Sequence, residues 1–283
     1  MGRRAERPML GMLLLIIAVQ VLSLGMMPAL SASEVRVFED PSATSNAILY
    51  IALVLIFTGF LLLATRLGWS WLISGAIQLC LFLSVFYVLG VYLPGMLAFS
   101  ISLALMLAMI YYPEWYVVDS LGILVSAGVS VLFGISMETL PVVVLLSILA
   151  VYDAISVYKT KHMVTLAESV IKIRAPLLFV VPKSRSYSFR LQGAEGRGAY
   201  FLGLGDAIMP SVLVVSANWS LPVGDEIFGV ALPAIGAMLG TYLGFTVLAM
   251  TSGEKPQAGL PFLNGGAVMG FLAGCVLSGV WPF

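Results

Sequence analysis

Residues 199–221 read AYFLGLGDAIMPSVLVVSANWSL, an apolar run long enough to cross a membrane as a helix, with Asp206 set inside it. An ionised carboxylate in hydrocarbon costs at least ~3 kcal/mol, so an acid at this depth is rare and indicates function. The apolar run at residues 140–158, LPVVVLLSILAVYDAISVY, holds Asp153, which we expect to be the only other acid as deep. The rest of the chain is then the scaffold that brings these two acids together.

The composition predicts a membrane protein. Of 283 residues, 60% are hydrophobic and 10% are charged, whereas about a quarter of a soluble domain is charged. With a mean hydropathy of +1.05, the chain is expected to be an all-α polytopic membrane protein. The basic residues are too few to indicate a nucleic-acid partner. Cys80 and Cys275 lie in apolar runs and indicate no disulfide framework, and the single histidine, His162, leaves no cluster of histidine ligands for a metal.

Apolar runs of about 20 residues, the length that crosses a bilayer as a helix, predict nine membrane spans. The expected spans are residues 9–30, 47–65, 69–90, 92–112, 117–137, 140–158, 199–221, 227–250 and 258–281. They form one integral membrane domain, in which residues 1–158 carry six spans and residues 199–283 carry three. A basic loop, residues 159–198, joins the two parts.

The first span has a second interpretation. Arg3, Arg4 and Arg7 precede its apolar core, and Ala-Leu-Ser-Ala-Ser at 29–33 resembles the cleavage site of a signal peptide. The run is long for a signal peptide and long enough to span the bilayer, so we expect a retained helix.

The placement of Lys and Arg predicts the orientation, because cytoplasmic loops carry the excess of these residues. With nine spans and a cytoplasmic N-terminus, 13 of the 14 Lys and Arg residues fall inside, and only Arg36 falls outside. Eight of the thirteen lie between Lys159 and Arg197. We therefore predict a cytoplasmic N-terminus and an extracytoplasmic C-terminus at Phe283.

The middle of the basic loop, residues 164–182, reads VTLAESVIKIRAPLLFVVP and mixes apolar residues with Lys172 and Arg174. This pattern is typical of a short helix lying on the inner leaflet. A basic loop that only follows the charge rule is an equally good interpretation, and the two are compatible.

Glycine recurs every four residues in each of the last two expected spans. The glycines are Gly236, Gly240, Gly244, Gly266, Gly270 and Gly274. Small residues at this spacing let two helix backbones approach closely in lipid, so this pattern predicts packing and no chemistry.

Asp153 and Asp206 are expected at equal depth. Asp153 lies five residues before the inner end of its span and Asp206 about seven after the inner start of the next, so both lie about 8–10 Å below the inner interface. Gly203 and Gly205 leave room beside Asp206 for another backbone. Pro210 removes the helical partner of the Asp206 carbonyl. Two acids on successive antiparallel helices are therefore able to face each other.

These residues resemble the motifs of the presenilin and signal peptide peptidase family of intramembrane aspartyl proteases. Tyr152-Asp153 is similar to its YD motif, Gly203-Leu204-Gly205-Asp206 to its GxGD motif, and Pro261-Phe262-Leu263 to its PAL motif. Phe262 stands where the family usually has alanine, which leaves the role of that position open. The resemblance covers the whole chain and is strongest to a compact archaeal homologue, which implies the cell membrane of a prokaryote.

The resemblance implies that peptide bonds are hydrolysed within the membrane by Asp153 and Asp206. The residues that it places around them are Tyr152, Gly203, Leu204, Gly205, Pro261, Phe262 and Leu263. Two nearby carboxylates do not both ionise cheaply, so one acts as general base on water while the protonated one polarises the scissile carbonyl. No metal or organic cofactor is needed. The implied partners are membrane-spanning helices as substrates and membrane lipid; a homo-oligomer is left open.

A secondary transporter is the main alternative, because paired membrane acids and broken helices also form proton or sodium sites. The two halves of the sequence show no obvious repeat, which counts against a transporter. A structural membrane protein whose aspartates pair with neighbours is a third interpretation. The set of three motifs favours the protease.

Overall fold

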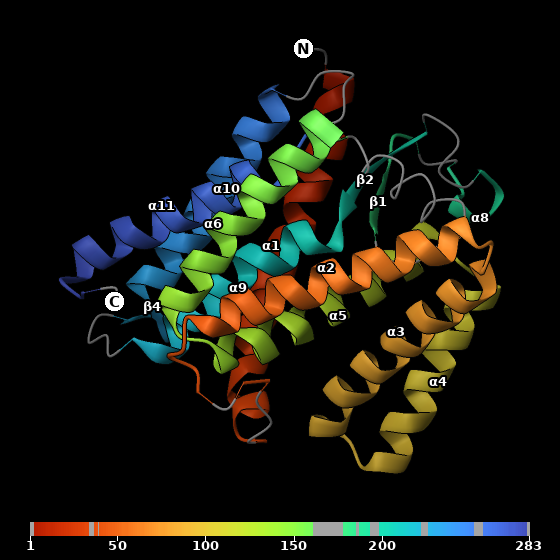
Figure 1. The fold of residues 1–283 in the computed structure, drawn as a ribbon, viewed down its shortest axis with the longest axis horizontal. Helices are drawn as coiled ribbons and strands as arrows, with labels where there is room; N and C mark the ends of the chain where they lie inside the picture. Colours follow the sequence, from red (N-terminus) through yellow and green to blue (C-terminus); the bar gives the residue numbers. More distant parts are fainter. Residues whose placement is uncertain are drawn as a thin grey trace.

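The structure is a computed structural model, and it describes residues 3–33, 37–38, 40–160, 178–184, 187–192, 198–221, 226–251 and 257–281. The described residues contain nine long helices (Figure 1), which confirms the predicted fold class. They are α1 (Arg3–Ser31), α2 (Ser45–Arg66), α3 (Ser70–Tyr92), α4 (Gly95–Tyr111), α5 (Trp115–Ser136), α6 (Thr139–Ile155), α9 (Leu204–Ser220), α10 (Leu232–Thr251) and α11 (Leu260–Ser278). Six of them, α1, α3, α5, α6, α10 and α11, are long and apolar enough to cross a membrane.

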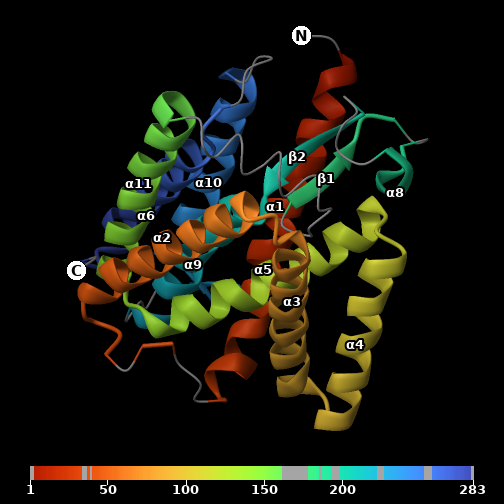
Figure 2. The ribbon, with the colours of Figure 1, turned by 45° about the vertical axis from the view of Figure 1, so that its right-hand side comes forward.

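The nine helices carry large apolar side chains on their outward faces. Exposed examples from four different helices are Ile48, Met96, Leu243 and Val276. A helix satisfies its own backbone hydrogen bonds, and for this reason an apolar chain in lipid folds into helices. Helices α3 and α4 form a pair at one side of the molecule in both views (Figures 1 and 2).

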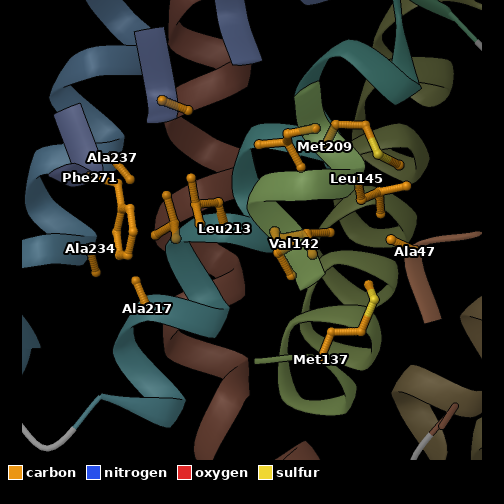
Figure 3. Close-up of a cluster of buried hydrophobic side chains, with 14 of the residues drawn as sticks. Ala47, Met137, Val142, Leu145, Met209, Leu213, Ala217, Ala234, Ala237 and Phe271 are labelled. Atoms are coloured by element: carbon orange, nitrogen blue, oxygen red, sulfur yellow. The ribbon is translucent and has the colours of Figure 1, made fainter. Parts of the chain in front are cut away.

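Helix α9 lies at the centre of the bundle and contacts α1, α5, α6, α10 and α11. Eleven of its 17 residues are buried. Figure 3 shows Leu213 of α9 between Phe271 of α11 and Val142 of α6, within the largest cluster of buried apolar side chains. Gly134 of α5 permits a close approach, because a Cβ there would lie 2.6 Å from Val215 Cβ. The helix that carries Asp206 is therefore fixed from several sides.

The glycines of α10 and α11 let the two helix backbones approach closely, as their spacing in the sequence predicts. A Cβ at Gly236, Gly240 or Gly244 of α10 would collide with the backbone carbonyl oxygen of Gly270, Gly266 or Phe262 of α11, respectively. The two backbones are in direct contact, and α10 and α11 lie side by side in Figures 1 and 2. The resulting seam fixes the position of α11, whose first turn belongs to the site described below.

A two-stranded antiparallel sheet precedes α9. Strand β1 (Leu178–Pro182) pairs with strand β2 (Ala199–Gly203) in a register that places Val180 opposite Phe201. The other described elements are the wide helical turn Ser156–Thr160 after α6, the short helix α8 (Phe189–Gln192), and the hairpin of β3 (Glu226–Ile227) with β4 (Val230–Ala231).

This sheet corrects two expectations. The predicted helix at 199–221 begins only at Leu204, because Ala199–Gly203 is extended and paired with β1. Asp206 therefore lies in the first turn of its helix and not about two turns inside it. Of the predicted interfacial helix at 164–182, residues 178–182 form a strand, and residues 164–177 lie outside the described part of the chain.

Candidate active site

Asp153 lies in the last turn of α6, and its side chain is only 7% exposed. Its Oδ2 accepts a hydrogen bond from the backbone N–H of Leu260 at 3.1 Å, and the N–H of Gly259 is a second donor. The first N–H groups of a helix have no partner within the helix itself. The carboxyl group of Asp153 therefore satisfies the start of α11 and binds the end of α6 to it.

Asp206 is half-buried and lies in the first turn of α9, three residues after the N-cap Gly203. Its carboxyl group accepts a hydrogen bond from the N–H of Gly203, as acids at this position of a helix often do for the N-cap. The positive end of the helix dipole also favours an acid here. Pro210, in the same helix, leaves the Asp206 carbonyl without its usual N–H partner.

The two carboxyl groups meet at one short segment of backbone. A Cβ added to Gly259 would lie 3.2 Å from Cγ of Asp206, while the next residue, Leu260, donates to Asp153. Asp153 is close enough for its charge to act on Asp206. Three helix ends, those of α6, α9 and α11, thus bring the two acids to the same short segment of backbone. We call this end of the bundle the aspartate end.

The known proteins that this chain resembles belong to one family. The sequence profile described as "Signal-peptide peptidase, presenilin aspartyl protease" matches residues 13–280, nearly the whole chain. The chain belongs to this family. It is an intramembrane aspartyl protease, and the predicted function class is confirmed.

Solved structures of a presenilin family intramembrane aspartate protease resemble the protease closely. One, in space group C222, is 38% identical in sequence, with a TM-score of 0.72, over 95% of this chain and 99% of that one. Another, in space group P2, is also 38% identical, with a TM-score of 0.70, over 95% and 98% of the two chains. No curated protein sequence matches the chain.

Leu204 and Gly205 of the GxGD motif have different surroundings. Leu204 is buried, and its Cδ2 would lie 3.0 Å from a Cβ at Gly122 of α5. Gly205 is exposed, with no atom within 4 Å of where a Cβ would be. Close to Asp206, Leu204 is therefore packed within the bundle, whereas Gly205 faces open space.

The third motif forms the first turn of α11. Pro261 is the second residue of that helix, and the N–H groups of Phe262 and Leu263 both donate to the carbonyl of Gly259 at 3.1 Å. Leu263 is fully buried in a core cluster. Tyr152, from the first motif, is half-buried beside Asp153. The three motifs thus converge at the aspartate end.

Sequence reasoning missed two polar residues near the site. Asn264 is buried in α11 and donates from Nδ2 to the carbonyl of Leu146 in α6 at 3.1 Å, which adds a second bond between these helices. The sequence signal that could have identified Asn264 is a single amide side chain within an apolar span. Asp119 is as buried as Asp153, so burial within the protein does not single out the two acids of the motifs. It lies near the start of its span, where an acid is easily taken for a residue at the interface.

Proposed function

We propose that Asp153 and Asp206 are the catalytic residues of this protease and that its substrates are the transmembrane segments of other membrane proteins. The observation that supports the proposal most is that both carboxyl groups border the Gly259–Leu260 segment. Two carboxyl groups held together are what acid–base hydrolysis of a peptide bond requires.

The chemistry uses the pair as a unit. The ionised carboxylate takes a proton from a water molecule, whose oxygen attacks the scissile carbonyl carbon, while the protonated carboxyl group donates its proton to the carbonyl oxygen. Return of a proton to the amide nitrogen then breaks the C–N bond. The two groups titrate together, so we give neither role to one named residue.

The surroundings of Asp206 suit an extended substrate segment. A helical substrate has its carbonyls hydrogen-bonded, so a segment must unwind before its peptide bond is attacked. Strand β2 leads directly into α9, and Phe201, opposite Val180, has its N–H and carbonyl directed away from β1. An unwound segment is able to pair with this edge, close to Asp206 and the open space at Gly205.

The membrane in which the protease lies and its orientation there are also part of the proposal. The chain is an integral multi-pass membrane protein, and we place it in the cell membrane of a prokaryote with the aspartate end toward the cytoplasm. The distribution of Lys and Arg supports that orientation.

The test is cleavage of a labelled membrane-spanning peptide by purified protein in detergent, with the products identified by mass. Asp153→Asn and Asp206→Asn preserve shape and should each abolish cleavage while the protein remains folded. Asp119→Asn is the matched control, because it changes an equally buried acid outside the pair and should leave cleavage largely intact. Cleavage by either of the first two variants would refute the dyad.

A further inference from the structure

Asp119 is a buried acid that the chemistry above does not use. It lies in the second turn of α5, is 7% exposed, and accepts a hydrogen bond through Oδ1 from the N–H of Val180 at 2.8 Å. Val180 is the middle residue of β1 and is fully buried. Acids within membrane spans are costly and usually have a function, and the hydrogen bond of this one leads toward the site.

The bond attaches the β1–β2 sheet to α5. In an antiparallel pair, successive residues direct their N–H groups alternately toward and away from the partner strand. The N–H of Val180 goes to Asp119, so it points away from β2, and its neighbours form the ladder with β2. Asp119 therefore binds the outer edge of β1 and leaves the pairing with β2 intact.

One turn further along α5, Gly122 holds the same sheet by close packing. A Cβ at Gly122 would lie 2.9 Å from Cε1 of Phe179 in β1 and 3.0 Å from Cδ2 of Leu204, the first residue of α9. Residues three apart lie on one face of a helix. On this face of α5, Asp119 accepts a hydrogen bond from the sheet, and the missing side chain at Gly122 leaves room for Phe179 of the sheet and Leu204 of α9.

The sheet connects to Asp206 without any linker. Gly203 is both the last residue of β2 and the N-cap of α9, and its N–H donates to the Asp206 carboxyl group. A displacement of β1 from α5 is therefore transmitted through the ladder to β2, and from Gly203 to Asp206.

We propose that Asp119 is a positioning residue of the protease, which holds β1 on α5 and thereby sets where the Asp206 carboxyl group lies. The role rests on the proposed catalytic function of Asp206. It requires an oxygen acceptor at position 119 and no charge. Asparagine, which keeps Oδ1, should therefore serve, whereas leucine, of similar size, removes the acceptor and leaves the Val180 N–H unpaired.

Asn218 offers a matched control at the other end of α9. Its Oδ1 accepts a hydrogen bond from the N–H of Ala231 in β4 at 2.7 Å, which is the same kind of contact between a helix side chain and a hairpin strand. It lies 12 residues beyond Asp206 in the same helix, or about 18 Å along the axis. Asn218→Leu should therefore cost stability without moving the carboxyl pair.

The test measures kcat and KM for a labelled membrane-spanning peptide, together with the unfolding temperature, on the full-length protein in detergent. Asp119→Leu should lower kcat by on the order of 10²-fold, as expected for a displacement of about 1 Å at a reacting group, with KM nearly unchanged. Asp119→Asn should restore kcat to near the wild-type value. Asn218→Leu should lower the unfolding temperature but keep kcat.

Three results would overturn the proposal. If Asp119→Asn is as slow as Asp119→Leu, the acid itself is required; if Asn218→Leu loses as much kcat as Asp119→Leu, the effect is general destabilisation. Should Asp119→Leu not fold, Val180→Pro is the second variant, because it removes the N–H that donates the same bond. An edge strand tolerates proline at a position whose N–H faces away from the partner strand. The same loss of kcat is expected. Normal kcat in Asp119→Leu with inactive Asp206→Asn would refute this inference alone, whereas cleavage by Asp206→Asn would refute the proposed function.

Discussion

Leu260 donates its backbone N–H to Oδ2 of Asp153 at 3.1 Å, although 107 residues separate the two in the chain. The donor is a helix-start N–H, which needs an acceptor, and the acceptor is a buried carboxyl group, which needs a donor. Because Gly259 next to it lies against Asp206, a single turn of α11 contacts both acids of the site.

Gly259→Ala should reduce cleavage without reducing stability. The added Cβ would lie 3.2–3.3 Å from the Asp206 carboxyl atoms, which is tighter than an ordinary contact, so the carboxyl group must move. The backbone at Gly259 is right-handed helical, with φ −80° and ψ −44°, so alanine meets no conformational strain. We expect kcat to fall by about 10–100-fold.

The control for this variant is Gly265→Ala in the same helix. Gly265 is exposed, and no atom lies within 4 Å of its Cβ position, so both cleavage and the unfolding temperature should stay near wild type. Equal cleavage by the two alanine variants would show that the contact between Gly259 and Asp206 has no consequence for the reaction.

Pro261→Ala should lower both the cleavage rate and the affinity for a peptide inhibitor that mimics the tetrahedral intermediate. Pro261 fixes φ in the first turn of α11, the turn that contacts both acids. Phe262→Ala is the control. It removes side-chain packing against a core cluster and should lower the unfolding temperature, but it keeps the carbonyl oxygen that contacts Gly244, so cleavage should be retained. A loss of activity in Pro261→Ala that only parallels a loss of unfolding temperature would make this proline a helix-start residue and nothing more.

Gly240→Ala should destabilise the protease. Its Cβ would collide with the carbonyl oxygen of Gly266, so α10 and α11 must separate, at a cost of about 1–3 kcal/mol for an overpacked contact. The unfolding temperature in detergent measures the effect, and Gly75→Ala, with no atom near its Cβ position, is the comparison. An unchanged unfolding temperature in Gly240→Ala would contradict the close packing of the seam.

Gln20→Leu should raise the unfolding temperature. Gln20 is fully buried in α1, and within the described part of the chain both polar atoms of its amide lack a hydrogen-bond partner. Leucine has a similar volume and no polar group, so the change should stabilise the fold by about 1–3 kcal/mol, the cost of an unsatisfied buried amide. A lower unfolding temperature would mean that the amide is hydrogen-bonded in the folded protein.

The orientation in the membrane is tested with reporter fusions. A reporter after Phe283 and one inserted within residues 183–197 should lie on opposite sides of the membrane, because 13 of the 14 Lys and Arg residues fall on one side in the predicted arrangement. Two reporters on the same side would refute this arrangement.

The sequence predicted the nine helices and the convergence of the motifs because lipid forces apolar segments into helices and makes a deep acid conspicuous. Strand β2 could not be predicted in this way, since Ala199–Gly203 is apolar and continuous with α9, and a short apolar run does not distinguish strand from helix. The hydrogen bond from Leu260 to Asp153 uses a backbone N–H, which every residue except proline has, so no sequence pattern predicts it.

The order of α6 and α11 along the chain also determines when the two acids assemble during synthesis of the enzyme. Asp153 is made 107 residues before Leu260, and at a synthesis rate of about 5–20 residues per second this interval lasts roughly 5–20 s. Throughout that time α11 has not been inserted, and Asp153 lacks the donors that hold it beside Asp206. A nascent or truncated chain that ends before α11 is therefore inserted into the membrane without the assembled pair of acids that we propose to be catalytic.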